Sequence, residues 1–89
     1  IILMNINELI AIVKNKLETK ITIQDLSIED KSFLHEKHKS HQKGKFHLKL
    51  TIKSHELKQL NKIESTKKIY NILDKELEEH IHSIQILFN

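Results

Sequence analysis

The fold is decided by one stretch of the sequence, FHLKLTIK at residues 46–53. Its apolar residues take every second place: Phe46, Leu48, Leu50 and Ile52. Successive side chains of a β-strand point to opposite faces, so this alternation predicts a strand with one buried face and one face in water. The buried face needs a second layer to cover it, and the flanking segments are expected to supply that layer.

Upstream of this strand, the sequence predicts a helix, a strand and a loop. Asn5 and Glu8 have the spacing of a capping box, and apolar residues then recur at helical intervals, which predicts an amphipathic helix over residues 6–18. A strand is predicted from Ile21 to Ile28, with a bulge near Gln24–Asp25 where the alternation slips by one place. The polar, basic residues 30–45 contain the only glycine and predict a long loop.

Downstream, a turn or a single helical turn is expected over Ser54–Leu60. Asn61 and Glu64 repeat the capping spacing and predict a second long helix, roughly residues 62–79. Alternating apolar residues up to Phe88 then predict a last strand.

The order helix, strand, strand, short helix, helix, strand predicts an α+β domain of two layers. Helices are expected to cover one face of a three-stranded sheet, while the other face carries Lys49, Thr51 and Gln85 in water. The chain of 89 residues is long enough for one domain, residues 1–89, with one modest core.

Composition narrows the classes of function. The chain has no cysteine, so disulfides, thiol nucleophiles and cysteine-ligated metal sites are excluded unless a partner supplies the thiolates. No apolar run approaches the about 20 residues that span a bilayer, and no signal peptide is evident, so a cytoplasmic location without membrane contact is expected. With no cysteine, no glycine-rich phosphate loop and no triad-like spacing, the prediction is a non-enzymatic protein.

The formal charge of +3 comes from 15 basic residues, all of them lysine. Abundant Ile, Lys and Asn, with scarce Gly, Ala and Pro, fit an A+T-rich genome better than selection for a basic surface. Arginine is the residue best suited to bidentate recognition of phosphate and guanine, so its absence weakens a sequence-specific DNA-binding interpretation.

Four segments in this order resemble the BolA family, over about Asn5 to Phe88. They are DKSFLHEKH at 30–38, HLKLTIKS at 47–54, IYNILDKEL at 69–77 and IHSI at 81–84. The resemblance implies a mixed sheet in an arrangement like a type II KH domain. It also implies a monothiol glutaredoxin partner and a shared [2Fe–2S] cluster, for which the glutaredoxin and glutathione supply thiolates. No cofactor is expected on the isolated chain, which is expected to be a monomer.

Carried over by position, the resemblance implies that His82 and one loop histidine, His35 first and His38 next, complete the ligation of the cluster. The chain departs from the family pattern in two places. Ser65-Thr66-Lys67 stands where an Arg-His-Arg-like stretch is usual, and the turn at 55–58 has no glycine. A GXXG loop is therefore absent, and KH-like clamping of phosphates is not supported.

Each histidine also has a plainer interpretation. The two-residue period of a strand places His82 at the beginning of the last strand, on the same face as Ile84 and Ile86. There it is either a half-buried metal ligand or a hydrogen-bonded histidine at the edge of the core. The histidines at 35, 38 and 41 recur at intervals of three, which leaves a zinc site or a solvated basic loop as alternatives.

Three further histidines have a structural or exposed interpretation. His47 and His55 are expected to be structural or exposed, with His47 on the polar face of its strand, where the sequence itself does not indicate which residue it contacts. His80 is expected to end the long helix.

The sequence therefore supports three hypotheses. The first is an adaptor for iron–sulfur cluster assembly, trafficking or iron regulation, with His82 as the main ligand. The second is a DNA-binding transcriptional regulator of the stress or morphology type, for which the candidate residues are Lys49, Lys53, Lys58, Lys62, Lys67 and Lys68. The third is a protein–protein interaction module without a metal.

Overall fold

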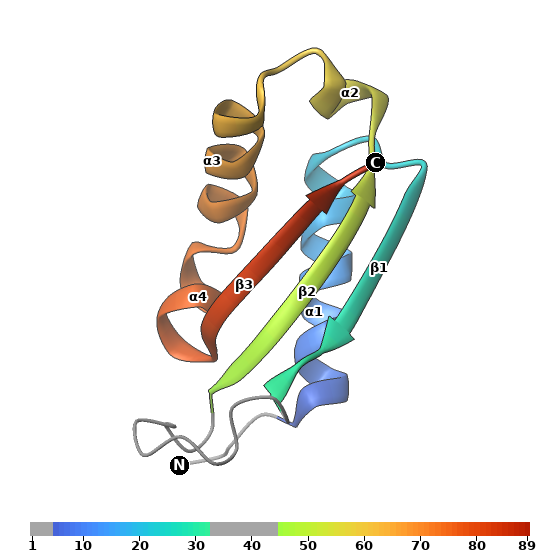
Figure 1. Ribbon diagram of the computed structural model, residues 1–89. Helices are drawn as coiled ribbons and strands as arrows, with labels where there is room; N and C mark the ends of the chain where they lie inside the picture. The colour runs from blue at the N-terminus through green and yellow to red at the C-terminus, as the bar shows by residue number, and fades with distance from the viewer. Residues whose placement is uncertain (1–4, 33–44) are drawn as a thin grey trace.

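The computed structural model describes residues 5–32 and 45–89, in which four helices and three strands occur (Figure 1). In chain order they are α1 (Ile6–Lys20), β1 (Asp25–Asp30), β2 (Phe46–Lys53), α2 (His55–Lys58), α3 (Lys62–Ile72), α4 (Asp74–Glu79) and β3 (Ile81–Phe88). Within these described ranges no helix has the length and apolar character to traverse a bilayer.

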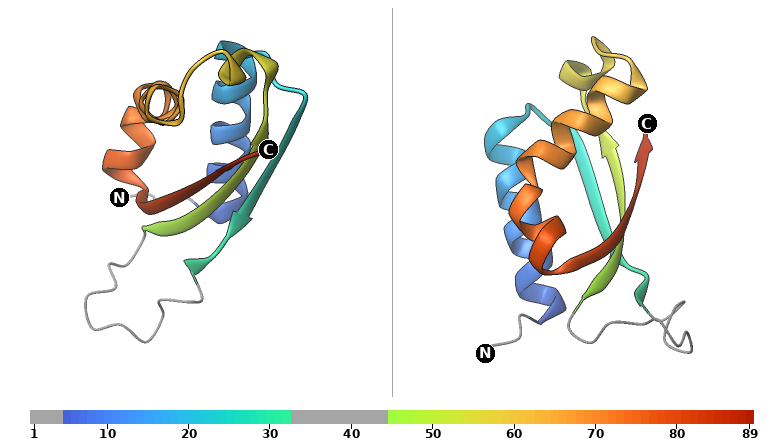
Figure 2. Two further views of the ribbon diagram at one scale, coloured as in Figure 1. Left: turned by 45° about the horizontal axis from the view of Figure 1, so that its top comes forward. Right: turned by 90° about the vertical axis from the view of Figure 1, so that its left-hand side faces the viewer.

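The three strands form one mixed sheet in the order β1-β2-β3. Strand β2 is central, pairing antiparallel with β1 and parallel with β3. The two further views show α1, α3 and α4 together on one face of this sheet (Figure 2). The predicted α+β class, with helices on one face of a three-stranded mixed sheet, is confirmed.

Both helix starts that the capping-box-like spacing predicts are confirmed, with Asn5 and Asn61 as the N-caps. The Asn5 side chain accepts a hydrogen bond from the backbone N–H of Glu8 at 2.8 Å and donates to the Glu8 carboxylate at 2.8 Å. Asn61 does the same for Glu64, at 2.8 and 3.3 Å. The bond from each glutamate N–H satisfies a group that the first helical turn leaves without a partner, and the bond between the two side chains holds the cap in place.

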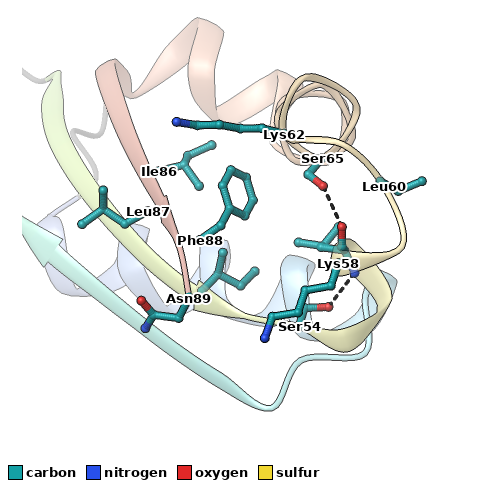
Figure 3. Close-up of a pocket in the computed structure, with 11 residues that line it drawn as sticks. Ser54, Lys58, Leu60, Lys62, Ser65, Ile86, Leu87, Phe88 and Asn89 are labelled. Atoms are coloured by element: carbon teal, nitrogen blue, oxygen red, sulfur yellow. Dashed lines mark hydrogen bonds between the residues drawn. The ribbon is translucent and has the colours of Figure 1, made fainter.

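The corner between β2 and α3 is built on two buried hydroxyl groups (Figure 3). The Ser54 hydroxyl donates to the carbonyl of Thr22 at 2.7 Å and accepts from the N–H of Leu57 at 3.1 Å, which caps α2. The Ser65 hydroxyl donates to the carbonyl of Leu57 at 3.0 Å and joins α3 to α2. The expected single helical turn after β2 is therefore confirmed, and both of its ends are anchored.

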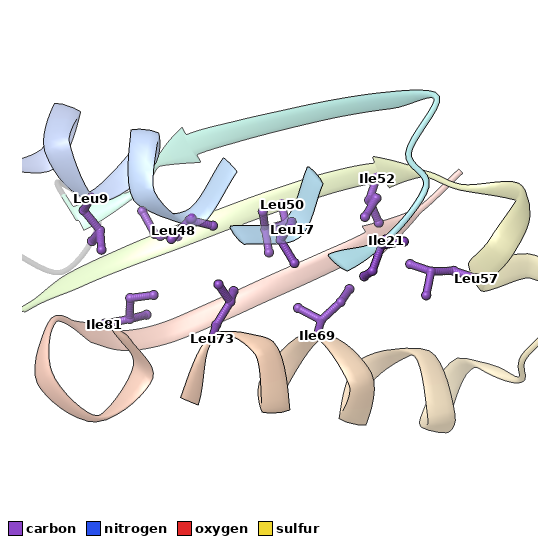
Figure 4. Close-up of a cluster of buried hydrophobic side chains, with 11 residues drawn as sticks. Leu9, Leu17, Ile21, Leu48, Leu50, Ile52, Leu57, Ile69, Leu73 and Ile81 are labelled. Carbon is purple, nitrogen blue, oxygen red and sulfur yellow. The ribbon is translucent and has the colours of Figure 1, made fainter. Parts of the chain in front are cut away.

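The core lies between the sheet and the helices (Figure 4). The apolar side chains of β2 that the opening stretch predicts are buried there, with Leu50 fully inaccessible and Leu48 and Ile52 nearly so. They pack against residues from every helix except α4 and from the start of β3: Leu9, Val13, Leu17, Ile21, Leu57, Ile69, Leu73 and Ile81. On the other face of the sheet Gln85 is exposed and Lys49 partly exposed, as the alternation predicts.

The predicted strand from Ile21 to Ile28 is wrong in its first half. Ile21 ends α1, donating its N–H to the carbonyl of Leu17 at 2.9 Å, and the strand begins only at Asp25. The register of β1 with β2 is continuous, so the expected bulge near Gln24–Asp25 is also absent. Ile21 lies four residues after Leu17 and extends the buried stripe of the helix, which explains the slip in the strand alternation.

The predicted long helix over residues 62–79 is two helices, α3 and α4, which meet at Leu73. No glycine or proline marks this position, so helical periodicity alone does not reveal the break. Leu73 is fully buried, and beyond it α4 turns Glu76 toward α1. There the Glu76 carboxylate contacts the Lys16 ammonium at 2.6 Å.

Candidate functional site

His82 lies in a bulge at the beginning of β3. Phe46 of β2 pairs with Ile81, but the next residue, His47, pairs with Ser83, so His82 is an extra residue on its strand. A bulge of this kind changes which face each following side chain occupies.

The bulge has a cause in the sequence. Ile81 is buried and Ile84 packs against the core, yet these two residues are three apart. A regular strand places only residues two or four apart on one face, so one extra residue is needed for both isoleucines to reach the core. The expectation that His82 shares a face with Ile84 and Ile86 is therefore wrong. Its imidazole is exposed and lies beside His47.

His47 is the buried neighbour of His82. The residue is only 6% exposed, and its ring centroid lies 4.8 Å from that of His82, with the ring planes inclined at 54°. The His47 Nδ1 is 2.5 Å from the Ser83 hydroxyl oxygen, and the tautomer of the ring decides which of the two donates. His47 does lie on the outer face of β2, as predicted, but it is buried and has partners on β3, which the sequence did not reveal.

The backbone of His47 is held from the other side by residues that follow β1. Its carbonyl accepts the N–H of Lys31 at 2.7 Å, and its N–H donates to the Ser32 hydroxyl at 3.0 Å. Ser32 is in turn held by the Asp30 carboxylate, which accepts its N–H at 2.9 Å. The last described residues before the segment 33–44 are thus attached directly to the histidine that contacts His82.

Of the three histidines assigned to metal ligation, the structure describes only His82. His35 and His38 lie outside the described residues, as does His41. Among residues 5–32 and 45–89, no group of three or more His, Cys, Asp or Glu side chains is arranged to hold a metal ion.

The other two described histidines are elsewhere. His55 is exposed at the opposite end of β2, in α2. His80 follows α4 as its C-cap, as predicted, with Nε2 at 3.6 Å from the Glu79 carboxylate.

The lysines assigned to nucleic-acid binding lie on different parts of the surface. Lys49 and Lys53 are on the outer face of the sheet, where the residues directly opposite them on β1 are Glu29 and Asp25. Residues directly opposite on an antiparallel pair have neighbouring side chains, so each of these lysines has an acidic neighbour that reduces the local positive potential.

Lys58 and Lys62 line a groove of about 590 Å³ between α2, the start of α3 and the end of β3 (Figure 3). Lys67 and Lys68 lie farther along α3, and Lys68 contacts the Glu56 carboxylate at 2.8 Å. The Lys68 hydrogen bond, together with the backbone N–H of Thr22, holds the pKa of Glu56 below its ordinary value.

Sequence reasoning missed two members of the site, His47 and Ser83. Each makes its contact only after β3 has paired with β2, and the two residues are 36 positions apart. One signal was available, because the three-residue spacing of Ile81 and Ile84 is incompatible with an unbroken strand.

The comparison with family models and the comparison with solved structures agree on one family. The model of the family described as BolA-like protein matches residues 17–88. Among solved structures, the chain is similar to BolA1 from Arabidopsis thaliana, with a TM-score of 0.75 and 24% identity over 89% of this chain and 87% of that one. It is also similar to the BolA domain of SufE1 from Arabidopsis thaliana, with a TM-score of 0.77 and 26% identity over the same shares.

A third structure, a bol-like protein from Babesia bovis, has a TM-score of 0.69 and 15% identity over 88% of this chain and 79% of that one. A search of the curated proteins found no match.

Proposed function

Because the chain belongs to the BolA-like protein family, we propose that it is a non-enzymatic accessory protein that binds a monothiol glutaredoxin and shares a [2Fe–2S] cluster with it. The observation that carries this proposal is the exposed His82 imidazole, backed by a buried histidine at 4.8 Å. An exposed imidazole with a fixed neighbour is a ligand that a metal carried by a partner can reach without rearrangement of the core.

The available metal-ligating residues fit a shared [2Fe–2S] cluster. Two histidines replace two thiolates on one iron in Rieske-type clusters, so a cysteine-free chain can ligate iron when its partner supplies the remaining thiolates. His82 is one such donor. His35, with His38 next, is proposed as the second, and the segment that carries both begins after Ser32, which is bonded to His47.

The test is visible circular dichroism of the chain mixed with cluster-loaded monothiol glutaredoxin and glutathione. The wild-type chain should convert the spectrum to that of a mixed species, and His82→Ala should not. His55→Ala is the matched control, because that histidine is exposed at the far end of β2. If His82→Ala gives the wild-type spectrum, the assignment of His82 is wrong.

The same mixture separates the cluster-sharing protein from a metal-free interaction module. An NMR titration with glutaredoxin should shift the resonances around His82 only when the cluster is present. Shifts that are the same without the cluster would favour the plain interaction module.

Separate His35→Ala and His38→Ala variants then identify the second ligand, because only loss of the true ligand should alter the visible circular dichroism spectrum of the mixture.

DNA binding is the second candidate function, and the groove lined by Lys58 and Lys62 favours it. No carboxylate within salt-bridge distance of either ammonium occurs among the described residues. Fluorescence anisotropy with duplex DNA should then show an affinity that falls steeply with salt and drops in a Lys58→Gln, Lys62→Gln double variant. Binding that shows no sequence preference, or vanishes at physiological salt, counts against a regulator.

A further inference from the structure

We propose that His47, oriented by the Ser83 hydroxyl, is the positioning residue that holds the His82 imidazole in the orientation required for ligation. This inference rests on the proposed function of His82. It adds two residues for which neither the sequence pattern nor the comparisons suggest a role.

The need for a positioning residue follows from the bulge. His82 is the extra residue of β3, so it has no residue opposite it on β2 to fix its side chain. Its imidazole is also exposed, which leaves little of the core to restrict its rotation. The ring of His47 is the described aromatic contact of this imidazole, with the ring planes inclined at 54°.

His47 is suited to this role because it is itself fixed at several points. Its backbone N–H and carbonyl are bonded to Ser32 and Lys31, and its ring Nδ1 is bonded to the Ser83 hydroxyl. Its burial, at 6% exposure, restricts the ring further. Because the His47 ring is held at these points, it can restrict the rotation of the neighbouring His82 imidazole.

The direction of the Ser83 side chain links the two histidines. Ser83 follows His82 in the bulge, and its register partner is His47. The hydrogen bond between Ser83 and His47 therefore fixes the ring of His47. It also fixes the backbone of Ser83, which follows the proposed ligand His82. Groups hydrogen-bonded to a metal ligand commonly change metal affinity by about 10- to 100-fold when they are removed, and a hydroxyl that acts through the ring of His47 is expected at the lower end of this range.

The main variant is Ser83→Ala, which removes the hydroxyl and leaves both histidines in place. Ser83→Thr is the rescue variant, because it restores a hydroxyl and suits a strand. His47→Phe keeps an aromatic ring beside His82 but loses Nδ1. Ser27→Ala is the matched control, since Ser27 is exposed on β1 and is not part of the site.

The first measurement uses the isolated chain and needs no cluster. In ¹H–¹³C NMR spectra, the His82 ring signals should move toward their values in an unstructured peptide in Ser83→Ala and return in Ser83→Thr. His47→Phe should change them through the altered ring beside His82, and Ser27→Ala should leave them unchanged. His82 signals that are identical in wild type and Ser83→Ala would overturn the proposal.

The second measurement is titration of cluster-loaded glutaredoxin, in the presence of glutathione, followed by visible circular dichroism. Ser83→Ala should weaken the affinity by about tenfold. It should keep the same final spectrum, because the ligands are unchanged. A purely structural role predicts instead that affinity falls only in proportion to the unfolded fraction, measured by urea denaturation, and this result would contradict positioning.

The two proposals fail in different ways. If His82→Ala leaves the mixed spectrum unchanged, ligation by His82 is wrong, while the NMR signals still decide whether His47 and Ser83 hold the ring. If His82→Ala abolishes the mixed spectrum but Ser83→Ala alters neither the NMR signals nor the affinity, only the positioning role is wrong.

Discussion

Strand β2 ends in two different environments. Where it runs into α2, the Ser54 hydroxyl joins two backbone segments, and the register with both neighbouring strands is regular. Where it begins, the register with β3 is interrupted, and a buried histidine faces an exposed one across the bulge. The first end satisfies backbone groups and completes the fold. The second end departs from strand geometry and turns His82, the proposed ligand, toward solvent, and bulges commonly redirect side chains next to functional sites.

The shared core sets the scale for this comparison. Leu50→Ala should lower the free energy of unfolding by about 2–5 kcal/mol, because Leu50 is fully buried in the central strand. Urea denaturation measures the loss, and hydrogen exchange should show both ends of β2 weakened together. Exchange that rises at one end alone would show that the two ends do not share one cooperative core.

Lys16→Met should have the next largest effect and act nearer the bulge. Glu76 is 5% exposed, its Oε2 contacts Lys16, and its Oε1 has no hydrogen-bond partner among the described residues. Loss of Lys16 removes the ion-pair partner of this buried carboxylate, but the Lys16 side chain is 37% exposed, so solvent screening limits the expected loss of unfolding free energy to about 1–3 kcal/mol. Lys14→Met, at an exposed position of the same helix, should change the unfolding midpoint little.

Ser54→Ala should separate the two ends most clearly. It removes the cap of α2 and a buried hydrogen bond to Thr22, at an expected loss of about 1–2 kcal/mol measured by urea denaturation. The NMR signals of the His82 ring should stay at their wild-type positions. Movement of those signals would show that the α2 end also controls the site.

Glu56→Gln should have the smallest effect, and this effect should depend on pH. The Lys68 hydrogen bond and the Thr22 N–H lower the pKa of Glu56 in the folded state from the ordinary 4.5. The unfolded chain therefore takes up the proton first as pH falls, so the charged carboxylate stabilises the fold above that value and ceases to do so below the lowered pKa. Thermal unfolding should show a slightly lower melting temperature for the variant than for the wild type at neutral pH, and this difference should vanish in acid. A difference in melting temperature that persists in acid would exclude the charge as its cause.

The features that the sequence predicted are the local ones. Each capping box is closed between residues three apart, and the alternation of β2 is present within eight residues. The missed features depend on distant partners. The break at Leu73 and the bulge at His82 exist because buried side chains must reach a core whose other half lies elsewhere in the chain.

The candidate site divides in the same way. His82 was identified through its position in a family pattern, whereas its exposure and its contact with His47 required the parallel pairing of β2 with β3. At Ile21 the local pattern itself misleads. The alternation of Ile21 and Ile23 predicts a strand, but Ile21 is the C-cap of the preceding helix α1.

The parallel pairing of β2 with β3 also matters during synthesis. Strand β2 can pair with β1 early, but it receives β3 only after three intervening helices have left the ribosome. A nascent chain therefore has no contact of His47 with Ser83 or His82 until residues 81–83 have docked. Contacts of such long sequence separation form late and slowly. The His47–His82 contact therefore reports that β3 has docked on β2, and the proposed ligand His82 has its histidine neighbour only from that point on.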